Sequence, residues 1–231
     1  MSYKTCVTVA EKTPRKTKHI LSKALKKSEY AEIRFDFLKP GDVPEALELV
    51  KNSLKRCVCT LRPKKEGGKF SSNERERVSI LKLISEYNPL LLDIEFQTLK
   101  KDKNLQKYVK NSKTEILVSW HDFKKTPSMN ELLRIQKNMT RFSKNIKIVT
   151  TAKSFIDSTK IMSLYNPDNK INLISFCMGE IGKHSRILCL YLGSPFTYVS
   201  LGKPIAPGQF SLDEVKLIFG KKKNRWQKHL L

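Results

Sequence analysis

The sequence lacks several features that would each indicate a particular class of protein. Its 231 residues contain no apolar run that approaches the roughly 20 residues of a membrane-spanning helix. Residues Met1 to Ala10 show neither the long apolar segment nor the small-residue cleavage site of a secretory signal. The nine glycines form no G-x-G-x-x-G stretch and no P-loop spacing with lysine. We therefore expect a cytoplasmic protein with no membrane association.

Cysteine is also scarce, and its number is odd. The five cysteines are Cys6, Cys57, Cys59, Cys177 and Cys189. An odd number in a chain expected to be intracellular argues against a disulfide framework. Cys57 and Cys59 are spaced C-x-C, but no nearby Cys/His pair completes a zinc site. The sequence predicts buried free thiols and no metal.

Acidic residues are only about half as numerous as basic ones. The 45 Lys and Arg against 22 Asp and Glu give a formal net charge of +23, and the pI is near 9.9. This charge raises the hypothesis of a nucleic-acid-binding protein, because clustered Lys and Arg displace counterions from phosphate. No RRM, KH or zinc-finger pattern is present, however, and aromatic residues are not interleaved with the basic runs. The hypothesis stays open, and within any other class we expect at most non-specific, salt-sensitive adsorption.

What the chain does contain is a regular alternation of short apolar runs and longer amphipathic stretches. The β-type runs are 5–9, 31–35, 56–60, 90–95, 115–120, 146–150, 172–176 and 197–201. Several are apolar on both faces, as is typical of parallel strands covered by helices. About eight strands and about eight helices predict a single-domain α/β fold, a (β/α)8 TIM barrel over residues 1–220. An open doubly wound sheet is the alternative, and residues 221–231 are expected to form a basic tail.

Capping patterns mark the starts of four predicted helices. An Asp, Asn or Ser is followed three residues later by Glu in the pairs Asp42/Glu45, Asn73/Glu76, Ser128/Glu131 and Ser211/Glu214. Each pair precedes apolar residues at helical spacing and follows a predicted strand, which is the order expected of β/α units.

Reactive groups in such a barrel gather where strands end, and the second predicted strand ends in charged residues. Glu32, Arg34 and Asp36 alternate along the chain, so an extended strand would place them on one face, pointing into the barrel. A charge in that position needs a partner or a ligand. The pattern favours a binding site, with a structural ion-pair cluster as the alternative.

Three further strand ends carry side chains with useful chemistry. Arg62 follows the third strand, and Glu66 lies beside two glycines that permit a tight turn back towards it. His121 ends the fifth strand, where an imidazole can act as acid or base, although a structural histidine is the alternative. Lys147 lies between apolar residues of the sixth strand, where burial disfavours the ammonium and a neutral amine can attack a ketone. A lysine that reaches solvent from the strand end is the alternative.

The last two units add recognition groups. Arg186 and Gln209 suit binding of a carboxylate and of hydroxyls. Phe176 and Met178 fit either the core or the wall of a pocket.

Taken together, these stretches resemble the type I 3-dehydroquinate dehydratases, the Schiff-base enzymes of the shikimate pathway. In the family's order, the matching stretches are Glu32-Ile-Arg-Phe-Asp36, Thr60-Leu-Arg-Pro-Lys-Lys-Glu-Gly-Gly68, Leu92-Asp-Ile-Glu95, Ser119-Trp-His-Asp-Phe123, Thr126-Pro127, Lys147-Ile148, Met178-Gly179 through Ser185-Arg186, Gly193-Ser194 and Ala206-Pro-Gly-Gln209. No single motif is decisive, but the ordered set is specific, and it runs from the second strand almost to the last helix.

The resemblance implies an enzyme that converts 3-dehydroquinate to 3-dehydroshikimate and water by syn elimination, without metal or organic cofactor. Lys147 would form an imine with the substrate ketone, His121 would move the proton, and Glu66 would orient His121. Arg186 would hold the substrate carboxylate. The residues that would hold or wall the ring are Glu32, Arg34, Arg62, Gln209, Met178 and Tyr198.

This sequence departs from the family pattern at two positions. Ile205 stands where a small polar residue is common, and Tyr198 stands where Phe is frequent. The loop 202–209 is expected to act as a lid, with hinge freedom at Gly202 and Gly208. The family is often dimeric, so a homodimer is a further expectation. Another lysine-imine barrel, such as a class I aldolase, is the alternative enzyme, but this loop shows no glycine-rich phosphate site.

Overall fold

Eight short apolar segments form the parallel strands of a nearly closed barrel. In the computed structural model, which describes residues 3–166, 168 and 170–220, the strands are β1 (Thr5–Val9), β2 (Tyr30–Arg34), β3 (Cys57–Thr60), β4 (Leu91–Glu95), β5 (Ile116–His121), β6 (Asn145–Thr151), β7 (Asn172–Met178) and β8 (Thr197–Val199). Their hydrogen-bonded order is β7-β6-β5-β4-β3-β2-β1-β8, and every pair is parallel. The predicted (β/α)8 barrel is confirmed, and each strand lies within two residues of its predicted bounds.

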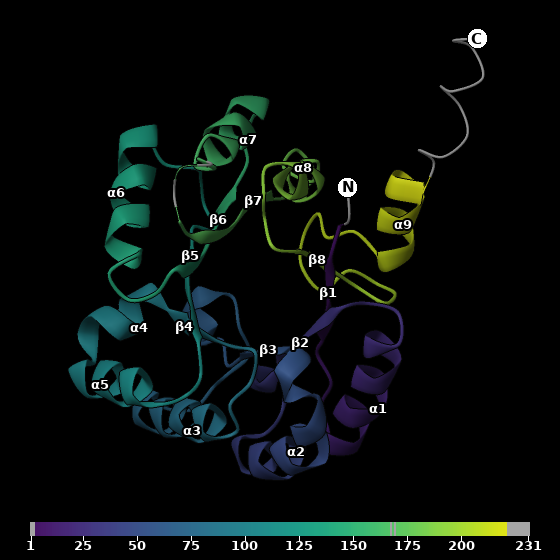
Figure 1. Ribbon diagram of the computed structural model, residues 1–231, viewed down its shortest axis with the longest axis vertical. Coiled ribbons are helices and arrows are strands. Elements are labelled where there is room, and N and C mark those ends of the chain that lie inside the picture. The colour runs from purple at the N-terminus through teal and green to yellow at the C-terminus, as the bar shows by residue number, and fades with distance from the viewer. Residues whose placement is uncertain (1–2, 167, 169, 221–231) are drawn as a thin grey trace.

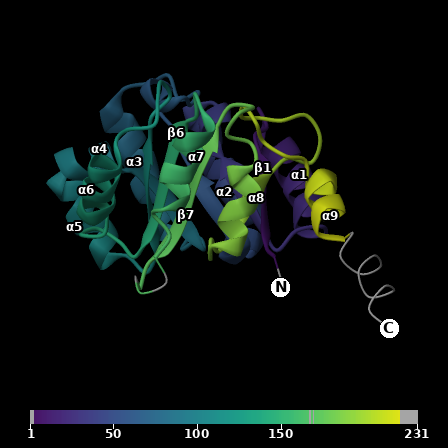
Figure 2. The same cartoon turned by 90° about the horizontal axis from the view of Figure 1, so that it is seen from above.

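The helices surround this barrel, as Figures 1 and 2 show. They are α1 (Pro14–Leu25), α2 (Val43–Val50), α3 (Glu74–Glu86), α4 (Phe96–Lys101), α5 (Lys103–Asn111), α6 (Met129–Met139), α7 (Phe155–Met162), α8 (Ser185–Tyr191) and α9 (Leu212–Gly220). Short 3-10 turns occur at η1 (Phe35–Phe37), η2 (Pro40–Asp42), η3 (Lys51–Arg56) and η4 (Lys64–Glu66). The helices bury their apolar faces against the strands, so both faces of each strand are covered.

Three of the four predicted capping pairs form. In Asn73/Glu76, Ser128/Glu131 and Ser211/Glu214, the backbone N–H of the Glu donates to the side chain of the cap residue. The prediction for Asp42 and Glu45 is wrong, because the side chain of Asp42 caps nothing. Asp42 already has helical backbone angles (φ −87°, ψ −10°), since it ends the 3-10 turn η2 that precedes α2.

Alternate strand residues face the inside of the barrel, and this inside has two layers. One layer is apolar and contains Cys6, Val58, Leu91, Leu117 and Ile174. Two residues further along four of these strands, the side chains are polar and buried: Thr8, Thr60, Asp93 and Ser119. Lys147 joins this second layer, because its register partner across β5 and β6 is Ser119. The apolar layer closes the barrel, and the polar layer forms the floor of a site at the carboxyl ends of the strands.

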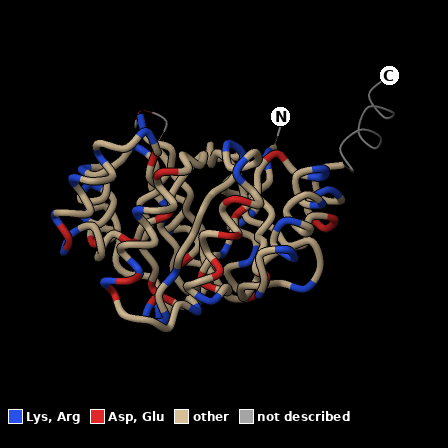
Figure 3. The backbone as a smooth tube through the Cα atoms, turned by 90° about the horizontal axis from the view of Figure 1, so that it is seen from below, with Lys and Arg blue, Asp and Glu red and all other residues tan. Residues whose placement is uncertain are grey.

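The remaining sequence predictions concern thiols, membranes and charge. All five cysteines are buried free thiols, as predicted. Within the described residues, no helix has the length and hydrophobicity to cross a membrane, and no group of three or more His, Cys, Asp or Glu could hold a metal ion. Lys and Arg are spread over the outside of the barrel (Figure 3). The predicted basic tail, 221–231, lies outside the described residues.

Candidate active site

A cavity of about 310 Å³ opens at the carboxyl ends of the strands. All ten residues to which the family resemblance assigned a role line it: Glu32, Arg34, Arg62, Glu66, His121, Lys147, Met178, Arg186, Tyr198 and Gln209. They come from strands β2, β5, β6, β7 and β8 and from the loops or helices that follow strands. The barrel therefore brings together side chains separated by up to 177 residues along the chain, from Glu32 to Gln209.

Lys147 is buried in the floor of this cavity, with 7% of its surface exposed. Its Nζ atom donates to Oδ2 of Asp93 at 3.4 Å and lies 4.0 Å from Oε1 of Glu32. The same atom lies 4.4 Å from the centre of the Tyr198 ring. The sequence placed Lys147 between apolar residues, but the amine itself is surrounded by the carboxylates of Asp93 and Glu32 and by the face of the Tyr198 ring.

Asp93 is a site residue that the sequence reasoning did not nominate. Its carboxylate is fully buried and accepts from Arg62 at 2.7 Å and from Ser119 at 2.6 Å, besides contacting Lys147. Burial opposes ionisation, but Arg62 and Lys147 hold the pKa of Asp93 below its usual range. The available signal was the alternation of Asp93 and Glu95 within an otherwise apolar strand, which places both carboxylates on one face.

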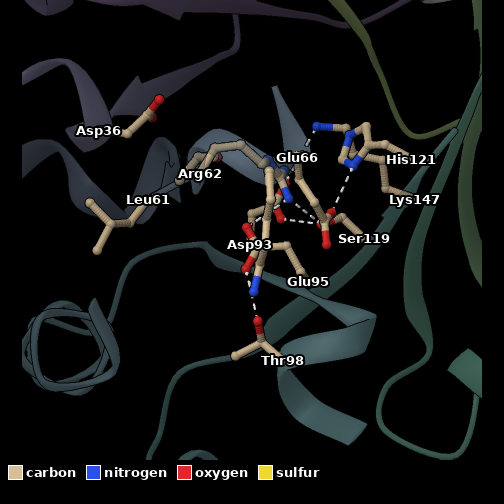
Figure 4. A network of polar contacts seen from close by, with 12 residues as sticks. Asp36, Leu61, Arg62, Glu66, Asp93, Glu95, Thr98, Ser119, His121 and Lys147 are labelled. Carbon is tan, nitrogen blue, oxygen red and sulfur yellow. Dashed lines mark hydrogen bonds and ion pairs between the residues drawn. The ribbon is translucent and has the colours of Figure 1, made fainter. Parts of the chain in front are cut away.

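Arg62 is the centre of a buried polar network, shown in Figure 4. Its NH1 group donates to Oε1 of Glu95 at 2.9 Å and to Ser119 at 2.7 Å, while NH2 donates to Asp93. Burial alone would lower the pKa of Arg62, but Asp93 and Glu95 outweigh this and raise it. Arg62 lines the cavity, yet both of its terminal nitrogens are already bound to protein groups.

His121 and Glu66 face each other at the side of the cavity. The Nδ1 atom of His121 lies 3.6 Å from Oε2 of Glu66, slightly beyond hydrogen-bond distance. Burial, reinforced by the charges of Arg62 and Lys147, holds the pKa of His121 well below its usual value. Burial together with the nearby Glu95 carboxylate raises the pKa of Glu66 to about 7. His121 is therefore a neutral imidazole near pH 7, and Glu66 titrates in that range.

The loop that carries Glu66 is held against the ring of Phe123, which stacks on His121 with 5.8 Å between ring centres. Gly67 has φ +74°, and a Cβ atom there would lie 2.6 Å from the Phe123 ring. Any side chain at this position would be strained and would push against that ring. The turn at Gly67 thus sets the approach of Glu66 to His121.

The charged residues of β2 do not all lie on one extended strand, as the sequence had indicated. The strand ends at Arg34, and Asp36 lies in the 3-10 turn η1, away from the cavity lining. Asp36 still reaches back, because Arg34 donates two hydrogen bonds to it at 2.7 and 2.8 Å. Glu32 does line the cavity and accepts from Thr60 at 2.9 Å. The binding-site interpretation therefore holds for Glu32, which lines the cavity, and the ion-pair interpretation holds for Arg34 with Asp36.

Arg186 is a buried cation without a carboxylate partner among the described residues. It is 2% exposed, its guanidinium lies 4.2 Å from the centre of the Phe176 ring, and its NH2 group donates to the carbonyl oxygen of Pro207 at 3.2 Å. Its Nε has no hydrogen-bond partner within the described part of the chain. Burial lowers the pKa of Arg186 to about 10. A buried guanidinium in this state favours an anionic ligand in the cavity.

The loop between β8 and α9 covers one side of the cavity. The side-chain oxygen of Gln209 accepts from the backbone N–H groups of Ile205 and Ala206, and its Nε2 donates to Thr8 at 3.2 Å. Gly208, with φ +69°, packs so closely that a Cβ atom would lie 2.5 Å from the carbonyl oxygen of Gly179. Gln209 thus ties this loop to β1, and the lid function remains a prediction.

The comparisons with known proteins indicate the same family as the sequence motifs. Residues 5–223 match the family model described as Type I 3-dehydroquinase. The chain is 36% identical to the 3-dehydroquinate dehydratase of Methanocaldococcus jannaschii, over 93% of this chain and 96% of that protein. It is 38% identical to the enzyme of that name from Dehalococcoides mccartyi, over 86% and 89% of the two chains.

Solved structures share the fold. The 3-dehydroquinate dehydratase of Geobacillus kaustophilus superposes with a TM-score of 0.85 at 22% identity, covering 97% of this chain and 93% of that one. That of Aquifex aeolicus gives a TM-score of 0.77 at 26% identity, covering 96% and 99%. The family model matches nearly the whole chain, and the alignments with these relatives cover most of both proteins, so this chain belongs to the type I 3-dehydroquinase family.

Proposed function

We propose that this protein is a 3-dehydroquinate dehydratase, a hydro-lyase of the shikimate pathway that forms 3-dehydroshikimate and water through a lysine imine. The observation that carries the proposal is the cavity itself. It holds a buried lysine amine, a neutral imidazole and a buried guanidinium without a carboxylate partner. These are the groups needed to bind a ketone, to move a proton and to hold a carboxylate.

The first step is formation of the imine. The amine of Lys147 gives up one proton and adds to the ketone carbon of the substrate. The ketone oxygen then leaves as water with two of the three protons of the original ammonium, and the third proton stays on the nitrogen of the imine. The protonated imine carries a positive charge on the nitrogen, close to Asp93 and Glu32, at 3.4 and 4.0 Å from the Nζ position. Both carboxylates stabilise that charge where it forms.

The second step is the elimination. His121, neutral because of its lowered pKa, takes a proton from the carbon next to the imine. The electron pair of that C–H bond moves towards the iminium and then returns to expel the hydroxyl, which leaves as water with the proton from His121. Water then hydrolyses the imine, which releases the conjugated enone and restores Lys147.

The remaining residues bind the substrate. Arg186 takes the carboxylate, because a fork of guanidinium donors matches its two oxygens. Glu32, Arg34 and Gln209 face the ring hydroxyls, and Arg62 acts chiefly through Asp93, since its terminal nitrogens already donate to protein groups. Met178 and Tyr198 wall the cavity.

We also propose the cellular setting of the enzyme. Five buried free thiols suit the reducing cytoplasm. We expect a homodimer in which residues 1–220 form the catalytic barrel and residues 221–231 a basic tail, with only non-specific adsorption to nucleic acid. Light scattering measured as the protein elutes from a size-exclusion column gives its molar mass, and therefore its oligomeric state.

The test of the function is a direct assay. The purified protein mixed with 3-dehydroquinate should produce the conjugated enone, which absorbs in the ultraviolet, and mass spectrometry should show loss of one water from the substrate. Addition of a metal chelator should leave the rate unchanged. A protein that is folded but forms no enone at any pH between 6 and 9 would refute the proposal.

The pH dependence should follow Glu66. Its ionised carboxylate stabilises the imidazolium that forms when His121 takes the substrate proton, so kcat/KM should rise with pH through about 7, the pKa of Glu66. In the variant Glu66→Gln this rise in kcat/KM with pH should disappear. Its kcat should fall about 10- to 100-fold, which is less than the fall expected when the base His121 is removed.

The same shift has the opposite effect on stability. A carboxyl whose pKa is raised by folding contributes stability at low pH that is lost as the pH rises through about 7. Glu66→Gln should therefore unfold at a higher temperature than the parent at pH 8 and at a similar temperature at pH 4.

The pH–rate prediction has its own contrary outcome. An unaltered pH–rate profile in Glu66→Gln would show that Glu66 does not act on His121.

A further inference from the structure

Arg77 lies in helix α3, outside the cavity lining, yet its side chain is fully buried. Arginine is rarely buried to this degree unless it is paired. Its donors reach Oε2 of Glu95 at 2.6 Å, Oε1 of Glu74 at 2.7 Å, Thr98 at 2.6 Å and the carbonyl oxygen of Leu61 at 3.2 Å. Its Nε also donates to Oε2 of Glu74 at 3.0 Å, so five protein oxygens hold the guanidinium in place.

Glu95 connects Arg77 to the cavity, because its two oxygens are bound by different arginines. Oε2 accepts from Arg77, and Oε1 accepts from Arg62 at 2.9 Å. Glu95 is fully buried, so neither oxygen is open to bulk solvent. The position of the Arg62 guanidinium thus depends on where Arg77 holds Glu95.

The chain of contacts continues from Arg62 to the reacting nitrogen. Arg62 donates to Oδ2 of Asp93, and that same oxygen accepts from Nζ of Lys147 at 3.4 Å. Figure 4 shows Asp93 and Glu95 beside Arg62, with Lys147 and His121 at the other side of the network. Every residue between Arg77 and Lys147 in this chain of contacts is less than 5% exposed.

From these contacts we infer that Arg77 is a positioning residue for the dehydration. With Glu95 it fixes Arg62 and Asp93, and through them the amine of Lys147. The inference rests on the proposed function, and it concerns a residue that never touches the substrate. Charge-assisted, fully buried hydrogen bonds of this kind hold a reacting group within the narrow range of positions that catalysis requires.

Glu66 provides a second readout. The charged groups that act on it are Glu95 and Asp93, which raise its pKa, and Arg62 and Arg77, which lower it; His121 faces it at 3.6 Å. Loss of the Arg77 charge should therefore move the pH–rate rise associated with Glu66 to higher pH.

The experiment compares Arg77→Met, Arg77→Lys and the control Arg75→Met. Arg75 is an exposed residue of the same helix, so its replacement removes the same charge without touching the network. We expect Arg77→Met to lower kcat about tenfold or more, with KM changed little, and to move the rise in kcat/KM to higher pH. Arg77→Lys keeps the charge but cannot donate to both Glu95 and Glu74 in the same fork, so kcat should fall while the pH rise stays in place. Arg75→Met should match the parent.

The outcomes separate this inference from the proposed function. A parent protein without dehydratase activity refutes the function. An active parent together with a folded Arg77→Met variant of parental kcat and pH profile overturns the inference, even if its melting temperature falls. Equal effects from Arg75→Met would also overturn it. If Arg77→Met does not fold, Arg77→Lys decides, since parental kcat in that variant contradicts a positioning role.

Discussion

Replacing Lys147 with alanine should abolish both turnover and covalent capture of the substrate. The amine is the group that forms the imine, and no neighbouring residue can supply it, because Asp93, Glu32 and Tyr198 surround its position. Loss of a covalent nucleophile reduces kcat by about 10⁴-fold or more. Borohydride added to parent enzyme and 3-dehydroquinate should reduce the imine and add the mass of the ligand to the peptide that contains Lys147.

The matched control for this experiment is Lys153→Ala. Lys153 is exposed and only six residues further along the chain, so it tests whether any lysine near the cavity can be trapped. This variant should keep full activity and full labelling. Because Lys147→Ala leaves Asp93 and Glu32 with one cation fewer, circular dichroism and Lys147→Met are needed to separate misfolding from lost chemistry. Labelling at Lys153, or turnover in folded Lys147→Met, would contradict the imine mechanism.

The second large effect is expected at His121, and it should separate turnover from trapping. His121→Asn removes the proton acceptor but retains a side chain of similar polarity and smaller size. We expect kcat to fall about 10²- to 10⁴-fold, the range for loss of a general base. The imine can still form on Lys147, so borohydride should still label the protein in the presence of substrate.

Both variants thus lose most of their turnover, but only His121→Asn should still be labelled by borohydride in the presence of substrate. A substrate deuterated at the carbon next to the ketone gives an independent check. The kinetic isotope effect on kcat should be larger in His121→Asn than in the parent, because proton removal limits the rate more strongly when the base is weak. Retained turnover in His121→Asn would assign the base to another group, and combination with Glu66→Gln would identify whether that group is Glu66.

The barrel could be predicted from sequence because its determinants are local. Each strand is a short apolar run such as Thr5–Val9, and several helices begin at a recognisable cap such as Ser128. Reading only strand ends then nominated most of the cavity residues, since parallel strands bring their carboxyl ends to one edge of the barrel, whereas Tyr198 was added by the family resemblance. The failures were also local: Asp42 and Asp36 lie in 3-10 turns, whose backbone does not follow the helix or strand geometry that the patterns assume.

The network beneath the cavity could not be predicted in this way. Asp93 and Glu95 interrupt an apolar strand, and nothing near them in sequence indicates which cations neutralise them. Their partner Arg62 lies 31 and 33 residues away along the chain, and Lys147 lies 54 residues from Asp93. Such pairings depend on strand register and on the inward direction of each side chain, which appear only once the barrel has closed.

The buried network around Lys147 also determines which charges lie next to the reacting nitrogen. The three buried carboxylates of Glu32, Asp93 and Glu95 lie beside Arg62, Arg77 and the nitrogen of Lys147. The protonated imine carries the same charge at the same place as a lysine ammonium. Conversion of a lysine ammonium into the protonated imine therefore leaves the sum of charges beside Asp93 and Glu32 unchanged, so carboxylates already in place stabilise the covalent intermediate.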